Sequence, residues 1–477
     1  FNMVLPNIFD HLQASEVQPT FDPILFDFNN DRRPLTTQEV KQCRFNQIIC
    51  TFGLIEKDFD VARAENVINY IYRLYPCLNT RIVFDQSLNW FRYEPQAYVD
   101  FKFDQHLSSI QSMAQFTNFF SHVCEVITPE KLTHWKLVKA EIKELNQVEY
   151  VLIQYIPHTF MGGKSCNLLF SLFNQIYMSK DVDFSKQPDP VQKSFFRSIL
   201  TFDRTNMKMA PPLKIAQTIQ TTKATGDILH DQQQMPDVPC NVFQVQTSQF
   251  AKIEGATFTQ SLNAIYAAQY AAYCYFHKDL QLDKEFSLTF TDIRDISDFL
   301  YKNGQLKELD FNKHLGMSAA MIAFLVKGTR QTSIQQLVEQ IQQMYMKFTQ
   351  TTQEQLIQRY AAYEYTTLIK SYPVAPVTLN VSNVGKNSLF DGPIVQSFNH
   401  TTCRYVEEEP QFLMIWPCLN SGKYGTFICQ FVTPEFTKEQ QHKTHEISMI
   451  VHDLVKIKGA ANVKIEDIIE IYELQFK

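Results

Sequence analysis

Apolar residues recur at helical spacing in several long stretches of the chain. Between Phe59 and Leu74 they fall three or four positions apart and so lie along one side of a helix. These apolar positions are Val61, Ala64, Val67, Ile68, Ile71 and Leu74. The same period predicts further helices over residues 165–177, 258–276, 332–350 and 437–457.

Other segments alternate between apolar and polar positions, which is typical of half-buried strands. Within residues 75–93, Pro76 ends the preceding helix and the strands RIVF and WFRY flank a turn. Residues 134–156 alternate on both sides of Asn146–Gln147, which predicts a hairpin. Single strands are expected over residues 285–295, 375–386 and 425–432. Because both halves mix strands with helices, the pattern predicts an α/β (α+β) fold.

A proline-rich region of weak periodicity divides the chain. Residues 181–240 contain QPDPVQ, MAPPLK and DQQQMPDVP, with one short helix expected around residues 195–200. We therefore expect an N-terminal lobe over residues 1–180, a linker over 181–240 and a C-terminal lobe over 241–477. A length of 477 residues is sufficient for two or three domains of about 150 residues.

Composition and charge argue against several classes of function. A net charge of −6 without any basic block argues against a nucleic-acid partner. The 10 cysteines form no CxxC pair, and His442, His445 and Glu446 lack the HExxH order, so no metal site is expected. No apolar stretch reaches the roughly 18–20 residues of a transmembrane segment. Reduced thiols favour an intracellular, cytoplasmic protein, or a mitochondrial matrix protein if a targeting peptide was removed.

The stretch IPHTFMGGKSCNLLFSLFNQIY, residues 156–177, joins an expected strand to an expected helix. Its GGKS resembles the end of a phosphate-binding loop, but that motif requires glycine where the chain has His158. Gly162 and Gly163 are typical of a tight turn, and Ser165 is placed to cap the helix.

His158 stands where the strand ends, a place from which side chains often point into a cleft. A neutral imidazole is a common general base near pH 7 because its pKa lies close to that pH. A single histidine in such a place is more often a packed or surface residue, so the pattern alone leaves both interpretations open.

The segment PHTFMGGKS, residues 157–165, resembles the motif His-His-x-x-x-Asp-Gly of the chloramphenicol-acetyltransferase-like superfamily. That group includes condensation domains and the alcohol and polyketide-associated acyltransferases. The second histidine corresponds to His158, the final glycine to Gly163 and a serine that often follows to Ser165. Further segments resemble the family in its order between residues 33 and 455. They are VINYIYRLYPCLNTRIVF, LTHWKLVKAEI, TFTQSLNAIYAAQYAAY, LTFTDIRD with the structural arginine Arg294, and VSNVGK.

The resemblance implies two similar lobes that form a V-shaped pseudo-dimer, with a cleft and a tunnel between them. It implies an acyltransferase that uses acyl-CoA or acyl-pantetheine as co-substrate and a small alcohol or amine as acceptor, without a permanently bound cofactor. His158 would take the proton of the acceptor as general base. Ser382 or Asn383 of the SNVG turn, or a backbone N–H near Gly163, would stabilise the oxyanion.

Two positions depart from the family motif. Pro157 replaces the first histidine, and Gly162 replaces the aspartate that in the family pairs with the arginine and holds the histidine loop in shape. Arg294 would then need another partner, such as Asp292 or Asp295, because a lone buried guanidinium is costly. The departure keeps a second hypothesis open, in which the chain is a pseudoenzyme that serves as a structural subunit of a larger protein complex.

Overall fold

The computed structural model describes parts of the chain on both sides of residues 192–239. In the first half these are residues 35, 48–56, 58–87, 90–121, 132–158 and 160–191. In the second half they are residues 240–278, 286–295, 315–316, 319–349, 379–386, 389–402, 416–431 and 438–476. The helix expected around residues 195–200 and most of the expected linker lie outside the described residues.

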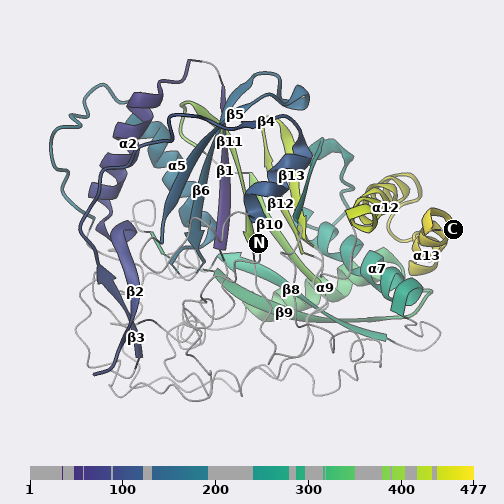
Figure 1. The fold of residues 1–477 in the computed structure, drawn as a ribbon. Helices are drawn as coiled ribbons and strands as arrows, with labels where there is room; N and C mark the ends of the chain where they lie inside the picture. Colours follow the sequence, from purple (N-terminus) through teal and green to yellow (C-terminus); the bar gives the residue numbers. More distant parts are fainter. Residues whose placement is uncertain are drawn as a thin grey trace, which may run out of the picture.

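A five-stranded sheet forms the centre of the first half (Figure 1). Its order is β11-β1-β6-β5-β4, and all neighbours are antiparallel except β4, which runs parallel to β5. The strands are β1 (Ile48–Glu56), β4 (Ser109–Ile110), β5 (His134–Ala140), β6 (Val148–Pro157) and β11 (Ile394–Thr402). Because β11 comes from the second half, a distant segment of the chain completes this sheet.

The second half contains a six-stranded mixed sheet with the order β7-β13-β12-β10-β8-β9. β12, β10 and β8 run parallel to one another, and the other neighbours are antiparallel. The strands are β7 (Cys240–Val245), β8 (Phe286–Asp295), β9 (Ala319–Gly328), β10 (Leu379–Lys386), β12 (Trp416–Gly422) and β13 (Gly425–Phe431). A separate antiparallel hairpin consists of β2 (Thr80–Asp85) and β3 (Trp90–Pro95).

The helices α2 (Val61–Leu74) and α5 (Gly163–Met178) pack on one face of the first sheet (Figure 1). α2 begins after Asp60, whose side chain accepts the Arg63 N–H at 3.0 Å. It ends before Pro76, which has no N–H to continue the helical bonds. The apolar stripe that defines α2 in the sequence is buried here with residues of α5 and β6. The cluster includes Ala64, Val67, Ile68, Ile71, Leu152, Ile156, Leu169, Phe170 and Phe173.

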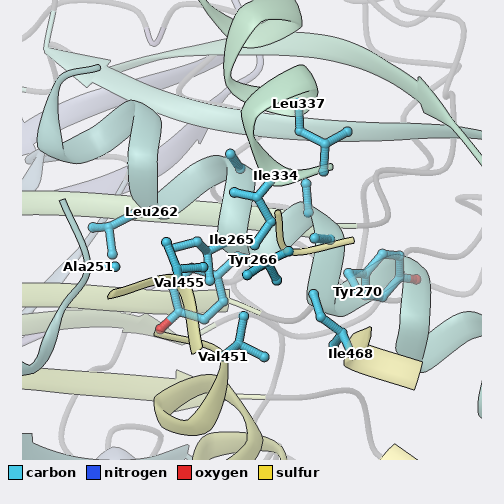
Figure 2. Packing of buried hydrophobic residues seen from close by; sticks show 14 of the residues in the cluster. Ala251, Leu262, Ile265, Tyr266, Tyr270, Ile334, Leu337, Val451, Val455 and Ile468 are labelled. Atoms are coloured by element: carbon cyan, nitrogen blue, oxygen red, sulfur yellow. The ribbon is translucent and has the colours of Figure 1, made fainter. Parts of the chain in front are cut away.

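Four helices of the second half pack together beside the second sheet (Figure 1). They are α7 (Phe258–Lys278), α9 (Ile334–Thr349), α12 (Lys438–Lys458) and α13 (Ile465–Phe476). Figure 2 shows Ile265 and Tyr266 of α7 among side chains from the neighbouring helices. α7 is rich in buried alanine, whose small side chain lets the neighbouring helices approach closely.

Aromatic side chains fill the space between the two sheets. Phe398 of β11 stacks on Phe52 of β1 and on Phe427 of β13, with ring centroids 4.8 Å and 4.4 Å apart. Phe116, from the short helix α3 (Phe116–Ser121), meets both Phe52 and Phe398 edge-on. All four rings are fully buried. This core contains residues of both sheets and therefore joins the two halves.

Two side-chain amides join β11 to the hairpin formed by β12 and β13. Asn420 donates to the Asn399 carbonyl at 3.1 Å and accepts the Asn399 N–H at 3.2 Å. Gln396 donates to the Gly425 carbonyl at 3.1 Å and accepts the Tyr424 N–H at 2.7 Å. A side-chain amide offers the same donor and acceptor as a peptide group, so each one replaces a main-chain pair. The position of one sheet beside the other is thereby fixed.

Two histidines, one buried and one half-buried, attach α12 to the rest of the second half. His452 accepts the Ala251 N–H at 3.2 Å through Nδ1, and its ring meets Phe250 edge-on. His445 stacks on Phe243 of β7, with ring centroids 3.9 Å apart. Burial lowers the pKa of His452 to about 3 and the pKa of His445 to about 4. Both rings are therefore neutral at pH 7.

Most of the elements expected from the sequence are confirmed. The five expected helices correspond to α2, α5, α7, α9 and α12. The hairpins correspond to β2–β3 and β5–β6, and the single strands to β8, β10 and β13. The periodicity does not predict β1, β7, β9, β11, β12 or α13. None of the described helices combines the length and hydropathy of a bilayer span.

Asn174 of α5 connects the first half to the second. Its Nδ2 donates to the Phe390 and Ile394 carbonyls at 2.7 Å, and its Oδ1 accepts the Ile394 N–H at 2.9 Å. We expect Asn174→Ala to lower the free energy of unfolding by about 2–4 kcal/mol, because buried main-chain groups lose their partners. Gln175→Ala, at an exposed neighbouring position, should change it by less than about 0.5 kcal/mol. Urea unfolding measures the free energy of unfolding of both variants and of the wild type. An Asn174→Ala midpoint equal to that of the wild type would contradict the role of Asn174.

The lowered pKa of His452 predicts loss of stability in acid. Because the folded-state pKa lies below the unfolded value of about 6.5, protonation favours the unfolded chain. The stabilising contribution is complete above pH 6.5 and is lost as the pH falls toward the folded pKa of about 3. His452→Gln keeps an acceptor for Ala251 without gaining a charge.

The advantage in unfolding free energy of the wild type over His452→Gln should therefore shrink as the pH falls from 8 to 4. Urea unfolding across this range measures it, with His106→Gln as an exposed control. A difference that stays constant with pH would show that His452 is not responsible.

Candidate functional site

His158 follows the last residue of β6 and begins the turn to α5. β6 ends at Pro157, which is paired with Ile48 of β1. The Pro157 carbonyl accepts the N–H groups of Phe160 at 2.9 Å and Met161 at 3.3 Å. The chain therefore reverses directly after the strand, and the carbonyl of Met161 comes close to the ring of His158.

This turn determines which ring nitrogen of His158 carries the proton. Nδ1 lies 2.9 Å from the Met161 carbonyl oxygen. A carbonyl oxygen can only accept a hydrogen bond, so Nδ1 must carry the hydrogen. The neutral ring then keeps its lone pair on Nε2, which makes Nε2 the basic atom of the site.

Burial keeps the His158 ring in its neutral form. The residue is only 6% exposed. Loss of hydration disfavours the cation and lowers the pKa of His158 below its usual value, although the bonds to backbone carbonyls oppose this shift. The ring is therefore a base that is already deprotonated at pH 7.

The start of α5 is bonded to a main-chain segment of the second half. Ser165 Oγ donates to the Gly316 carbonyl at 2.8 Å and accepts the Gly316 N–H at 3.0 Å. The N–H of Gly162 donates to the same carbonyl at 3.1 Å. The expectation that Ser165 caps α5 is wrong, because Gly162 occupies the N-cap without a side-chain bond. Ser165 lies inside the first turn, and its hydroxyl is engaged by Gly316.

Ser382 of β10 is linked to the start of α5 through two buried side chains. Ser382 is the register partner of Cys418 on the neighbouring parallel strand β12. The Cys418 thiol donates weakly to Asn399 Oδ1 at 3.9 Å. The Asn399 amide lies 3.4 Å from the place where Gly163 would carry a Cβ atom. Ser382, Cys418 and Asn399 thus form a polar row that leads to Gly163, although Ser382 and Gly163 are far apart in the sequence.

Asn383 and Arg294 have different surroundings. Asn383 Nδ2 donates to Thr259 Oγ1 at 2.9 Å, and its Oδ1 accepts a main-chain N–H two residues later at 3.0 Å. Its amide therefore supports the end of β10 against the start of α7. Arg294 lies in β8, paired with β9. The side chains of Arg294, Asp292 and Asp295 are outside the described part, so an ion pair at Arg294 stays a prediction.

Sequence reasoning missed Gly316, Asn399 and Cys418. All three come from the second half. Gly316 and Asn399 reach the start of α5 only through the tertiary fold, and Cys418 contacts Asn399. Asn399 stands in β11, where Gln396, Ser397 and Asn399 obscure the apolar alternation of a strand. The SNVG turn indicates β10 but gives no sign of the two strands that connect it to Gly163.

The arrangement has the parts of a general base site. The lone pair on Nε2 can accept a proton from a hydroxyl or an amine, and the polar row beside Gly163 can donate hydrogen bonds to developing negative charge. Among the described residues, no three His, Cys, Asp or Glu side chains gather closely enough to hold a metal ion.

Comparisons with known proteins bear on the fold of the chain. No protein-family model matches the chain, and no curated protein matches it by sequence. Several solved structures do match. The first condensation domain of the calcium-dependent antibiotic synthetase, in complex with a substrate analogue, matches with a TM-score of 0.62 and 9% identity, over 92% of this chain and 99% of that domain.

Two further solved structures match over most of the chain. Polyketide synthase associated protein 5 from Mycobacterium tuberculosis has a TM-score of 0.56 and 12% identity, over 89% of this chain and 99% of its own. The X-domain from teicoplanin biosynthesis has a TM-score of 0.56 and 10% identity, over 93% of this chain and 99% of that domain. Similarity at such low identity establishes the fold alone. This chain therefore has a condensation-domain-like fold, as the resemblance of its histidine motif predicts.

Proposed function

We propose that the protein transfers an acyl group from a CoA or carrier-protein thioester to an alcohol or amine, with His158 as the general base. The observation that carries the proposal is the buried, neutral ring of His158, whose Nδ1 is bonded to the Met161 carbonyl. The condensation-domain-like fold supports acyl transfer as the reaction class.

In the proposed reaction, Nε2 accepts the proton of the acceptor hydroxyl or amine as its oxygen or nitrogen attacks the thioester carbonyl. A tetrahedral intermediate forms, and its collapse breaks the carbon–sulfur bond. The departing thiolate takes the proton from the imidazolium of His158, which restores the neutral ring. No acyl-enzyme forms, so the reaction needs no serine or cysteine nucleophile.

The negative charge on the tetrahedral intermediate needs hydrogen-bond donors. Ser382 is the better of the two candidates from the SNVG turn, because it belongs to the polar row that reaches Gly163. Asn383 already donates one of its amide hydrogens to Thr259. A backbone N–H at the start of α5 would add the positive end of the helix dipole.

A second candidate function is that of a non-catalytic structural subunit. Two observations favour it. His158 is only 6% exposed, and Gly162 stands where the family motif has an aspartate. In this case the fold would serve to hold protein partners in a larger assembly.

The first test is acyl transfer by the purified protein. We expect turnover of at least one radiolabelled acyl-CoA or acyl-pantetheine carrier protein when it is offered with a panel of alcohols and amines. His158→Ala should lower kcat by about 10²–10⁴-fold, because the proton acceptor is lost. His106→Ala, which removes an exposed histidine from a loop, should keep the wild-type rate.

Equal rates for wild type and His158→Ala would exclude His158 as the base. Absence of turnover with every donor and acceptor, together with stable co-purification in a defined protein complex, would support the structural subunit instead.

The pH dependence gives a second test. Because the pKa of His158 is lowered by burial, the base stays active at neutral pH. We expect kcat/KM to be constant between about pH 7 and 8 and to fall about tenfold per pH unit below the ring's pKa, which lies under 6.5. An inflection above pH 7 would contradict a neutral, buried His158.

A further inference from the structure

The segment at Gly316 is attached to the first half at several points. The neighbouring Leu315 is 6% exposed and packs in the core that contains α2 and α5. Gly316 itself exchanges two bonds with the Ser165 hydroxyl and accepts a third from the Gly162 N–H. Ser165 is likewise only 6% exposed, so water does not readily replace these bonds.

These bonds lie next to the group that orients His158. The His158 ring donates to the Met161 carbonyl. This carbonyl and the Gly162 N–H belong to the same peptide group, the one that joins Met161 to Gly162. A peptide group is planar, so the direction of the Gly162 N–H fixes the direction of the Met161 carbonyl. The Gly162 N–H donates to the Gly316 carbonyl. The Ser165 hydroxyl bonds both the carbonyl and the N–H of Gly316.

We propose that Ser165 is a positioning residue for His158. By holding the Gly316 main chain, it orients the peptide between Met161 and Gly162 and so keeps Nδ1 protonated and Nε2 basic. This inference rests on the proposed function for its catalytic consequence, but not for its structural content. The geometry of the base in one half thereby depends on contact with the other half.

A hydroxyl is required at position 165 because its oxygen both donates to Gly316 O and accepts from Gly316 N. Alanine loses both bonds, whereas threonine keeps the oxygen. Ser171 provides a matched control on the same helix. It is also 6% exposed and accepts a second-half N–H, that of Phe390, at 3.1 Å, but it lies farther along α5, away from the histidine turn.

The test uses the full chain with histidine labelled by 15N in the ring. The His158 resonances are assigned by their loss in His158→Gln, and the 15N shifts distinguish the two neutral tautomers. In wild type, Ser165→Thr and Ser171→Ala we expect the tautomer protonated at Nδ1. In Ser165→Ala we expect this tautomer to lose its dominance. Near-ultraviolet circular dichroism checks that each variant is folded, and Ser165→Cys replaces Ser165→Ala if the latter does not fold.

Kinetics give the second readout. Ser165→Ala should lower kcat by about 10–100-fold, with KM changed by less than about twofold, because the base is misplaced while substrate contacts remain. Ser165→Thr should restore most of kcat, and Ser171→Ala should keep it.

The two proposals fail in different ways. If the wild type turns over no substrate but Ser165→Ala alone shifts the tautomer of His158, the positioning role stands and the acyltransferase proposal falls. If folded Ser165→Ala keeps the Nδ1-protonated ring, or if Ser171→Ala shifts it equally, the positioning role is wrong.

Discussion

The hydrogen bond from His158 Nδ1 to the Met161 carbonyl determines what the rest of the site can do. It leaves a single basic atom, Nε2, and it does so without any charged partner. Burial adds the second condition, since it holds the ring neutral at physiological pH. A ring that was buried without this bond could exchange tautomers and would present its lone pair in no fixed direction.

That bond depends in turn on how the two halves of the chain are joined. β11 crosses from the second half into the first sheet, and the amides of Gln396 and Asn420 attach it to the β12–β13 hairpin. Phe398 continues the contact through stacked rings on both sides. The same junction carries Asn399 to Gly163, so the elements that hold the halves together also reach the start of α5, next to the histidine turn. Fold and site are therefore not independent in this protein.

The sequence predicts the elements with strong periodicity and the position of His158. α2 and the β5–β6 hairpin follow from regular apolar spacing, and the motif around His158 indicates the superfamily fold. β11 is not predicted, because Gln396, Ser397 and Asn399 resemble a surface loop although all three are buried. Their side chains are bonded by groups of distant segments, namely the main chain at Tyr424 and Gly425 and the side chain of Asn167, which no local pattern reveals. The role of Ser165 is misjudged for the same reason. The local pattern indicates a cap at the start of a helix, whereas in the fold the Ser165 hydroxyl bonds Gly316, a residue of the second half.

The departure at Gly162 has a structural counterpart. Where the family motif carries an aspartate, this chain has Gly162, whose N–H donates to the Gly316 carbonyl of the second half. The V-shaped arrangement and the tunnel stay predictions of the resemblance.

The central claim, that Nε2 of His158 faces the reacting groups, is tested most directly by a crystal structure with a non-hydrolysable acyl-thioester analogue and an acceptor. The account predicts the acceptor's hydroxyl or amine within about 3 Å of Nε2. An analogue bound away from His158, or an Nε2 engaged by a protein side chain, would contradict it.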